Sequence, residues 1–309
     1  MTATDDPRLT ETLQKMADSF VDWPRAPIHR RPSEAGLDYE DVTFPSEDGV
    51  PLEGWFIPAP GSDRLVIANH PRWFTRAGLP SHLEPWRSIA AATGNDFEIN
   101  FVPDYRLLHD AGYHVLAYDL RNFGQSGTGN GGVFTVGNFE SRDVIGSLRY
   151  ARSRPDLAGA RIGLFSRCVG ANATMKAMTR APAEFEDVRC MVSPQPLSAG
   201  VSMARALERF GIPVERMQDL DDLVFRRTSF HIEEMSPVAW ASSVRVPTLL
   251  YQVRDDVYTH PSDVQAIHDN LATAEKDLFW IEGTTRRWDG YAHFQREPDR
   301  ILEWFDRYL

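Results

Sequence analysis

Cys168 stands in a segment whose spacing suits a nucleophile held on a sharp turn. An apolar run, 161–166, leads into Cys168, and a helical pattern follows. A nucleophile elbow requires small residues two positions before and two positions after the nucleophile, because the strained turn brings those backbones together. Ser166 and Gly170 meet this requirement around Cys168, whereas Leu164 breaks it for a turn centred on Ser166. Because a helix N-terminus favours negative charge, the sequence predicts a thiolate nucleophile at Cys168.

A carboxylate and a histidine are expected to follow this cysteine along the chain. The histidine would carry protons and the acid would orient it, and after an elbow of this kind the acid precedes the histidine. Asp255 directly follows the apolar run 247–253, with Asp256 as the close alternative. His293 lies between the last expected strand and the last expected helix. These positions predict a triad of Cys168, His293 and Asp255.

Two backbone N–H groups are expected to hold the oxyanion of an acyl-transfer reaction. One should come from Val169, after the nucleophile, and the other from the loop that follows the first parallel strand. In that loop, Pro71 has no N–H to donate. Arg72 is therefore the simplest second donor, with Trp73 as the alternative.

These residues together resemble the α/β-hydrolase superfamily, and the Cys168 elbow resembles its dienelactone hydrolase branch, which uses cysteine, aspartate and histidine. The stretch Asp119–Gly127 is similar to the D-x-R-x-x-G-x-S loop that follows the second parallel strand of such folds. The resemblance covers about residues 39–309. It implies the α/β-hydrolase fold and chemistry on an acyl group, while the superfold itself hosts many reactions.

The expected secondary structure agrees with this resemblance. Segment 39–58 is typical of an antiparallel hairpin, and short apolar runs follow at 64–70, 113–119, 161–166, 188–193, 247–253 and 277–283. Helical patterns occupy about 8–20, 104–112, 138–154, 168–180, 261–272 and 298–309. Continuous apolar strands that alternate with helices predict an α/β protein whose mostly parallel sheet is covered on both faces.

Two long segments interrupt this alternation, 71–103 and 196–245, and long insertions are usually functional. We expect a helical extension at 1–38, a core of 39–195 and 246–309, and an inserted cap or lid at 196–245. Trp73 and Phe74 of the first insertion and His231 of the second are expected to bind substrate. Apolar side chains in both insertions favour a partly apolar or aromatic acyl group. Three arginines, Arg72, Arg76 and Arg167, are candidates for an anionic substrate group.

Composition excludes several other classes of function. The formal net charge is -11, and no Lys/Arg cluster alternates with aromatic residues, so nucleic acid is not an expected partner. The acidic N-terminus and the lack of a long apolar stretch predict a cytoplasmic protein without membrane association. Cys190, the second of two cysteines, is expected to be a small buried hydrophobe. No metal-binding or phosphate-binding motif is present, and no cofactor is expected.

Three hypotheses for function follow from these residues. The first is hydrolysis of an ester, lactone or thioester through an acyl-cysteine on Cys168. The second is acyl transfer or cyclisation, in which an alcohol, amine or carbon nucleophile captures the same acyl-cysteine. The third is a catalytically silent ligand-binding protein that keeps the fold. The expected partner is a small acyl compound, and a homodimer is left open.

Overall fold

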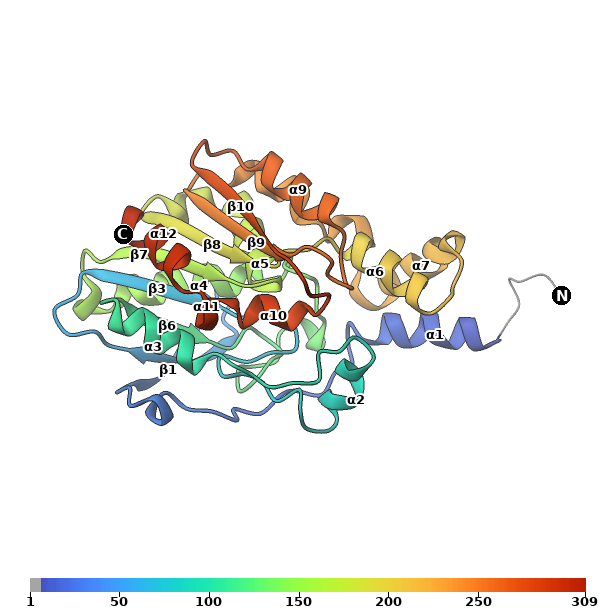
Figure 1. Cartoon of the computed structure of the whole chain (residues 1–309), viewed down its shortest axis with the longest axis horizontal. Helices are drawn as coiled ribbons and strands as arrows, with labels where there is room; N and C mark the ends of the chain where they lie inside the picture. The colour runs from blue at the N-terminus through green and yellow to red at the C-terminus, as the bar shows by residue number, and fades with distance from the viewer. Residues whose placement is uncertain (1–6) are drawn as a thin grey trace.

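The computed structural model describes residues 7–309, so the first six residues of the expected N-terminal extension lie outside it. Its centre is an eight-stranded sheet in the order β1-β2-β6-β3-β7-β8-β9-β10 (Figure 1). The strands are β1 (Glu40–Pro45), β2 (Pro51–Ile57), β3 (Arg64–Asn69), β6 (His114–Tyr118), β7 (Arg161–Ser166), β8 (Val188–Pro194), β9 (Thr248–Val253) and β10 (Lys276–Ile281). β2 pairs antiparallel with both β1 and β6, and all the other pairs are parallel. The mostly parallel α/β sheet expected from the sequence is confirmed.

Helices lie on both faces of this sheet (Figure 1). The main ones are α3 (Val102–Asp110), α4 (Ser141–Ser153), α5 (Val169–Arg180), α9 (Pro261–Asn270) and α12 (Asp299–Tyr308). Alternate residues of β7 show how the layers pack. Phe165 meets the Phe305 ring of α12 at 6.1 Å between centroids, and a Cβ added at Gly163 would lie 2.7 Å from Leu309. The missing side chain at Gly163 therefore leaves the space that Phe305 and Leu309 fill against β7.

Both insertions form structure above the carboxyl ends of the strands. The first holds β4 (Gly78–Leu79), α2 (Trp86–Ala91) and β5 (Ile99–Asn100). The second, 196–245, holds α6 (Ala199–Arg209), α7 (Met217–Thr228) and α8 (Pro237–Trp240). It is called the cap segment below.

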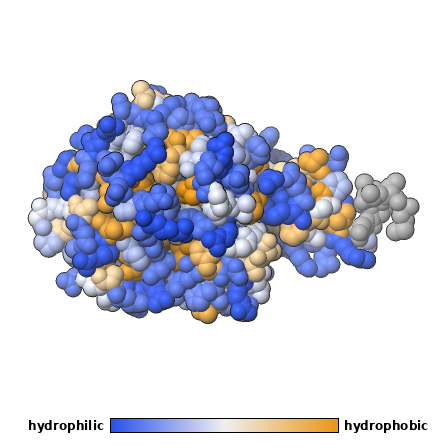
Figure 2. All heavy atoms as spheres, in the orientation of Figure 1, coloured by the Kyte–Doolittle hydropathy of each residue, from blue (hydrophilic) through white to orange (hydrophobic). Residues whose placement is uncertain are grey.

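The N-terminal helix α1 (Pro7–Asp18) packs against α7 of the cap segment, and together with α6 these helices project from one side of the molecule (Figure 1). Arg227 of α7 pairs with Asp18 at 2.6 Å and donates to Gln14 at 3.1 Å. Leu13 and Ala17 are buried on the inner side of α1. The surface in Figure 2 is largely hydrophilic, with apolar atoms also on this projecting part. None of the helices in residues 7–309 is long and apolar enough to cross a membrane.

Candidate active site

Cys168 lies on a strained turn between β7 and α5. β7 ends at Ser166 and α5 begins at Val169, which makes Cys168 the N-cap residue, with φ 51° and ψ -113°. A positive φ costs a side-chain-bearing residue about 1–3 kcal/mol, so the surroundings must hold it in place. The Cys168 N–H donates to the carbonyl of Pro194 at 2.8 Å, which ties the turn to the end of β8.

The residues two positions away explain why the turn can form. A Cβ at Gly170 would lie 2.7 Å from the carbonyl oxygen of Asn69, a distance that real Cβ atoms do not reach. On the other side, Ser166 Oγ accepts from Asn69 Nδ2 at 2.8 Å and contacts Thr174 Oγ1 at 2.9 Å. The close approach of β3 to the turn therefore requires a glycine at 170 and a small residue at 166.

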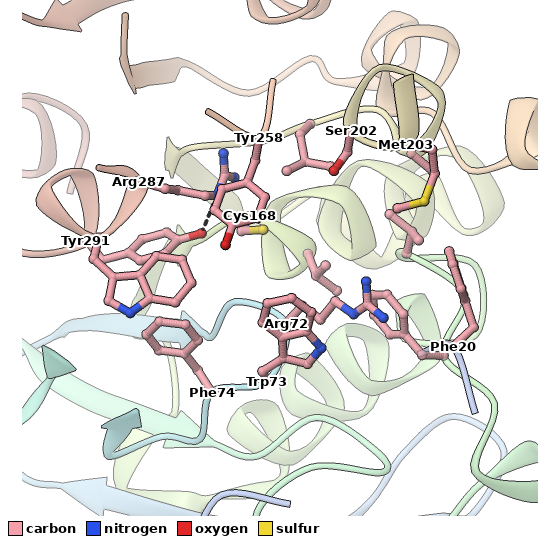
Figure 3. A pocket seen from close by; sticks show the side chains of 16 residues that line it. Phe20, Arg72, Trp73, Phe74, Cys168, Ser202, Met203, Tyr258, Arg287 and Tyr291 are labelled. Atoms are coloured by element: carbon pink, nitrogen blue, oxygen red, sulfur yellow. Dashed lines mark hydrogen bonds between the residues drawn. The ribbon is translucent and has the colours of Figure 1, made fainter. Parts of the chain in front are cut away.

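The Cys168 side chain borders a cavity of about 70 Å³ (Figure 3). Trp73 and Phe74 lie in its wall, as do Ser202 and Met203 of the cap segment. The rest of the lining is mostly apolar: Phe20, Arg72, Phe134, Val136, Val169, Leu197, Ala199, Tyr258, Arg287, Trp288 and Tyr291. At about 10–15 Å³ for each water, the cavity has room for about five water molecules. A short acyl group fits in a space of this size.

Two side chains of the short helix α10 (Arg287–Tyr291) lie in the same cavity lining as Cys168 and interact with it electrostatically. Arg287 and Tyr291 are four residues apart, so they lie one above the other on the same face of the helix. Arg287 Nε donates to the Tyr291 hydroxyl at 2.9 Å, and both side chains border the same cavity as Cys168 (Figure 3). Burial raises the pKa of Tyr291 well above its usual value, which keeps the hydroxyl protonated as a donor.

Of the two candidate acids, Asp256 points inward and Asp255, the expected one, does not. Asp255 is exposed to solvent, whereas Asp256 is buried and pairs with Arg287. The carboxylate of Asp256 also accepts from Gln252 Nε2 at 2.7 Å and from the backbone N–H of Tyr258 at 2.9 Å. Adjacent residues of an irregular loop point in different directions, and here only the second of the two points inward.

Arg287 keeps its charge in this buried position. Burial acts to lower its pKa, but Tyr291, Asp256 and Cys168 outweigh burial and leave the pKa well above the usual value. Arg287 also donates to the carbonyl oxygen of Gln195, and Gln195 Nε2 donates back to the Arg287 carbonyl. A guanidinium with these partners is fixed in both position and charge.

His293 does not lie where the predicted triad needs it. It begins the next short helix, α11 (His293–Arg296), and its ring contacts Tyr251 and Phe279 at centroid distances of 5.5 and 5.4 Å. It lines a separate hollow with Glu297 and Arg300. The physical reason is α10, which directs Arg287 and Tyr291 at the cysteine and turns the chain away before residue 293. The expected assembly of Cys168, His293 and Asp255 is therefore not formed.

His231 is also away from the cavity that contains Cys168. Its ring stacks on Phe225 at 4.4 Å, and its Nδ1 lies 2.7 Å from the Asp221 carboxylate. A hydrogen bond with that carboxylate raises the pKa of His231. These contacts hold His231 to other residues of the cap segment instead of directing it at a substrate.

The expected oxyanion donors border the cavity, and their role stays a prediction. Val169 is the first residue of α5, where N–H groups have no partner within the helix. Arg72 lies in the opposite loop, and His70 fixes that loop. The Nε2 atom of His70 accepts from the Leu120 N–H at 2.8 Å, so its Nδ1–H donates to the Pro71 carbonyl at 2.7 Å. Burial lowers the pKa of His70 to about 4, which keeps it neutral.

Cys190 lies inside the sheet on β8 and is fully buried. Burial raises the pKa of its thiol to about 12. A thiol of this kind does not ionise near neutral pH, so Cys190 is a small apolar residue and a natural control for Cys168.

Arg287, Tyr291 and Gln195 are the site residues that sequence reasoning missed. One signal was present, because an arginine and a tyrosine four apart with Gly290 between them can face one site from a single turn of helix. A Cβ at Gly290 would lie 2.2 Å from Gln195 Nε2, so the Gln195 side chain would have to move to admit one. Among residues 7–309, no cluster of histidine, cysteine and acidic side chains is suited to hold a metal ion.

Comparison with known proteins places the chain by structure only. No protein-family model and no curated protein sequence matches it. The Pyrococcus furiosus esterase Pf2001 is similar over 94% of this chain and 98% of its own, with a TM-score of 0.69 and 22% identity. The hydrolase GrgF from a Penicillium species has a TM-score of 0.61 and 16% identity, over 88% of this chain and 99% of its own.

A dienelactone hydrolase from Anabaena variabilis has a TM-score of 0.51 and 18% identity, over 88% of this chain and 99% of its own. At these identities the likeness is one of fold, and the activities named for these proteins are their own. The eight-stranded sheet, the strained turn after β7 and these three structures lead to one conclusion. This chain has the α/β-hydrolase fold.

Proposed function

We propose that this protein moves an acyl group from a thioester or other activated ester onto Cys168, and from Cys168 to a second nucleophile. One observation carries the proposal: a buried cation, Arg287, and a protonated hydroxyl, Tyr291, line the same mostly apolar cavity as Cys168 and interact with it electrostatically. A positive charge next to a cysteine at a helix N-terminus favours the nucleophilic thiolate.

The first half-reaction needs no imidazole when the substrate is a thioester. The thiolate of Cys168 attacks the carbonyl carbon and forms a new C–S bond, while the carbonyl oxygen takes the negative charge. The N–H groups of Val169 and of Arg72 or Trp73 would hold that oxyanion. When the oxyanion collapses, the bond to the leaving sulfur breaks and a thiolate departs. Charge is conserved, and no proton has to be supplied.

An alkyl ester is a poorer substrate for the same site. Its leaving group is an alkoxide, which is far more basic than a thiolate and has to be protonated as it departs. Tyr291 is the hydroxyl at hand, but its pKa is raised well above the usual value by burial, so it gives up its proton reluctantly. We therefore propose thioesters ahead of alkyl esters as the substrate class.

The second half-reaction favours an acceptor other than water. Water is a weak nucleophile and needs a positioned base to attack an acyl-cysteine. Within residues 7–309, no histidine lines the cavity at Cys168, and His293 packs against Tyr251 and Phe279. An amine, a thiol or a carbanion attacks a thioester without such help. Acyl transfer is thus the better-supported second step, and hydrolysis is the slower competing step.

Intact-mass spectrometry tests the proposal directly. The protein is incubated with N-acetylcysteamine thioesters of short acids and with the matched ethyl esters. We expect a single acyl adduct from the thioesters that persists in buffer and disappears when an amine or thiol is added. Cys168→Ala should abolish the adduct, and the matched variant Cys190→Ala should keep it.

Each alternative has its own result in this experiment. An adduct that forms in Cys168→Ala would refute the proposed nucleophile. An adduct that decays quickly to free acid in buffer alone would replace acyl transfer with hydrolysis. If no ester or thioester modifies the wild type, the silent ligand-binding hypothesis takes its place.

A further inference from the structure

A second, larger chamber of about 650 Å³ adjoins the cavity at Cys168. The two share five lining residues, Arg72, Trp73, Ser202, Met203 and Tyr258. The outer chamber is bordered by α1, α2 and α6, which come from the N-terminal extension and both insertions. A substrate that reaches Cys168 from this side passes the guanidinium of Arg72.

The three arginines that the sequence offered for an anionic group differ sharply in the structure. Arg76 forms a buried ion pair with Asp119, and Arg167 forms another with Asp104 at 2.6 Å. Both charges are therefore already compensated inside the protein. Arg72 is the exception, because among the residues that the structure describes it has no ion pair with a carboxylate.

Arg72 is nevertheless held firmly in place. Its Nη2 donates to the carbonyl and hydroxyl oxygens of Ser19, and its guanidinium lies 4.5 Å from the Phe134 ring and 4.7 Å from the Trp73 ring (Figure 3). The remaining nitrogens, Nε and Nη1, have no hydrogen-bond partner within residues 7–309. Burial lowers the pKa of Arg72 to about 10, so it stays charged at neutral pH although its surroundings disfavour the charge.

The other charged side chains that line the outer chamber are positive, as Arg72 is. Besides Arg72 the lining includes Lys15 and Arg209, and within residues 7–309 no aspartate or glutamate lines the chamber. Lys15 is paired with Glu11 at 2.7 Å, whereas Arg209 donates to the carbonyl of Val257. In a chain with a formal net charge of -11, a chamber lined in this way concentrates anions.

We infer that the substrate carries a carboxylate, and that Arg72 binds this carboxylate between the two chambers while the carbonyl to be attacked lies at Cys168. This inference rests on the proposed function and narrows its substrate class to anionic acyl donors. A carboxylate supplies the direct ion-pair partner that Arg72 lacks within residues 7–309 and accepts charge-assisted hydrogen bonds from its unused nitrogens. The cavity at Cys168 is too small for a long acyl chain, so the carboxylate lies only a few bonds from the carbonyl that is attacked.

Binding to Cys168→Ala tests the inference without any chemistry at Cys168. The probes are monomethyl succinate, which is an anion, and dimethyl succinate, which is neutral, and calorimetry gives both affinities. We expect the anion to bind at least about tenfold more tightly, the size of one charge-assisted hydrogen bond. Adding Arg72→Gln should abolish that preference, and Arg72→Lys should keep part of it. Adding Arg189→Gln, which removes an exposed arginine that borders a different hollow, should change nothing.

Acylation of the wild type then locates the carboxylate within the substrate. The N-acetylcysteamine thioester of succinate is compared with that of 4-methylpentanoate, which has the same shape without the charge. Thioesters of a common neutral acid with 3-mercaptopropionate and with butanethiol form the second pair. If only the first pair shows an Arg72-dependent preference for the anion, the carboxylate belongs to the acyl group. If only the second pair shows it, the carboxylate belongs to the leaving group.

The inference and the proposed function fail in different ways. If the two succinate esters bind Cys168→Ala equally, or if Arg72→Gln and Arg189→Gln have the same effect, the inference is wrong. Neutral thioesters that still acylate Cys168 would leave the proposed function standing in that case. Conversely, an Arg72-dependent preference without any acylation of the wild type would keep the anion site and remove the enzyme.

Discussion

Arg287 forms a buried ion pair with Asp256, and the two occupy the places where the sequence suggests a histidine and its orienting acid. The guanidinium cannot serve as a general base, because an arginine does not lose its proton near neutral pH. It can hold a fixed positive charge against the Cys168 sulfur. The proposed mechanism therefore relies on this fixed charge beside Cys168 and on no general base at this position.

Asp256→Asn should weaken both stability and activity, whereas Asp255→Asn should change little. Removing the charge of Asp256 leaves Arg287 as an unpaired buried cation, a change that costs about 3–5 kcal/mol when one partner of a buried pair is lost. Asp255 is exposed, and surface substitutions usually stay within about 0.5 kcal/mol. Urea denaturation of the two variants measures the difference. Equal losses in both would mean that the buried pair is not the orienting element.

Arg287→Met combined with Asp256→Asn should make Cys168 less reactive without leaving a buried charge. The double variant replaces the ion pair by two uncharged side chains, so we expect the protein to fold. Alkylation of Cys168 by iodoacetamide at pH 7.5, followed by mass spectrometry, should slow by about tenfold or more. Unchanged alkylation in a folded double variant would show that Arg287 does not support the thiolate.

His293→Gln should leave the rate of acylation by thioesters within about threefold of wild type, because its ring packs against Tyr251 and Phe279 and not at the cysteine. Stopped-flow or quenched-flow acylation measures this rate. A fall of a hundredfold or more, the size expected for loss of a general base, would restore the triad that the sequence predicts.

Most of the fold was predictable, because buried strands such as β3 and β9 are short continuous apolar runs that only a covered parallel sheet accommodates. The cysteine elbow was predictable for a similarly local reason. The side chains at 166 and 170 must be small for the turn to pass Asn69, and this requirement is visible in five consecutive residues.

The partners of Cys168 were not predictable in the same way. Asp255 and Asp256 are neighbours with identical chemistry, and only the direction of the loop after β9 separates them. Whether Tyr291 or His293 faces the elbow depends on where α10 begins and ends, and a helix from Arg287 to Tyr291 is too short for periodicity to reveal. The resemblance to cysteine hydrolases predicts a histidine at this place and implies no role for an arginine or a tyrosine.

Tyr291→Phe should separate substrates by their leaving groups. The variant keeps the ring that packs in the wall but removes the hydroxyl that accepts from Arg287 Nε at 2.9 Å in the lining that it shares with Cys168. Thioesters, whose leaving group needs no proton, should lose less than about tenfold in rate. Alkyl esters should lose about a hundredfold or more, because they depend on the donated proton. An equal loss for both classes would assign Tyr291 to positioning of the sulfur alone.

His70 makes the stability of the protein sensitive to mild acid. Burial lowers the pKa of His70 to about 4, below the 6.5 of an exposed histidine. Between these values the unfolded chain binds a proton that the folded protein does not, so the free energy of unfolding falls as the pH falls. At pH 5 the loss from this group amounts to about 2 kcal/mol relative to pH 7. Other groups also titrate in this range, so the test compares variants.

Urea denaturation at pH 7 and at pH 5 is measured for the wild type and for His70→Gln, whose amide can donate to the Pro71 carbonyl and accept from the Leu120 N–H as the neutral imidazole does. We expect the variant to lose less stability than the wild type between the two pH values, by about 2 kcal/mol. The matched control is His260→Gln, because His260 is exposed. We expect its stability to change with pH as that of the wild type does. The same loss in all three proteins would mean that His70 takes up its proton in the folded state, and that the loop carrying Pro71 and Arg72 does not depend on a neutral imidazole.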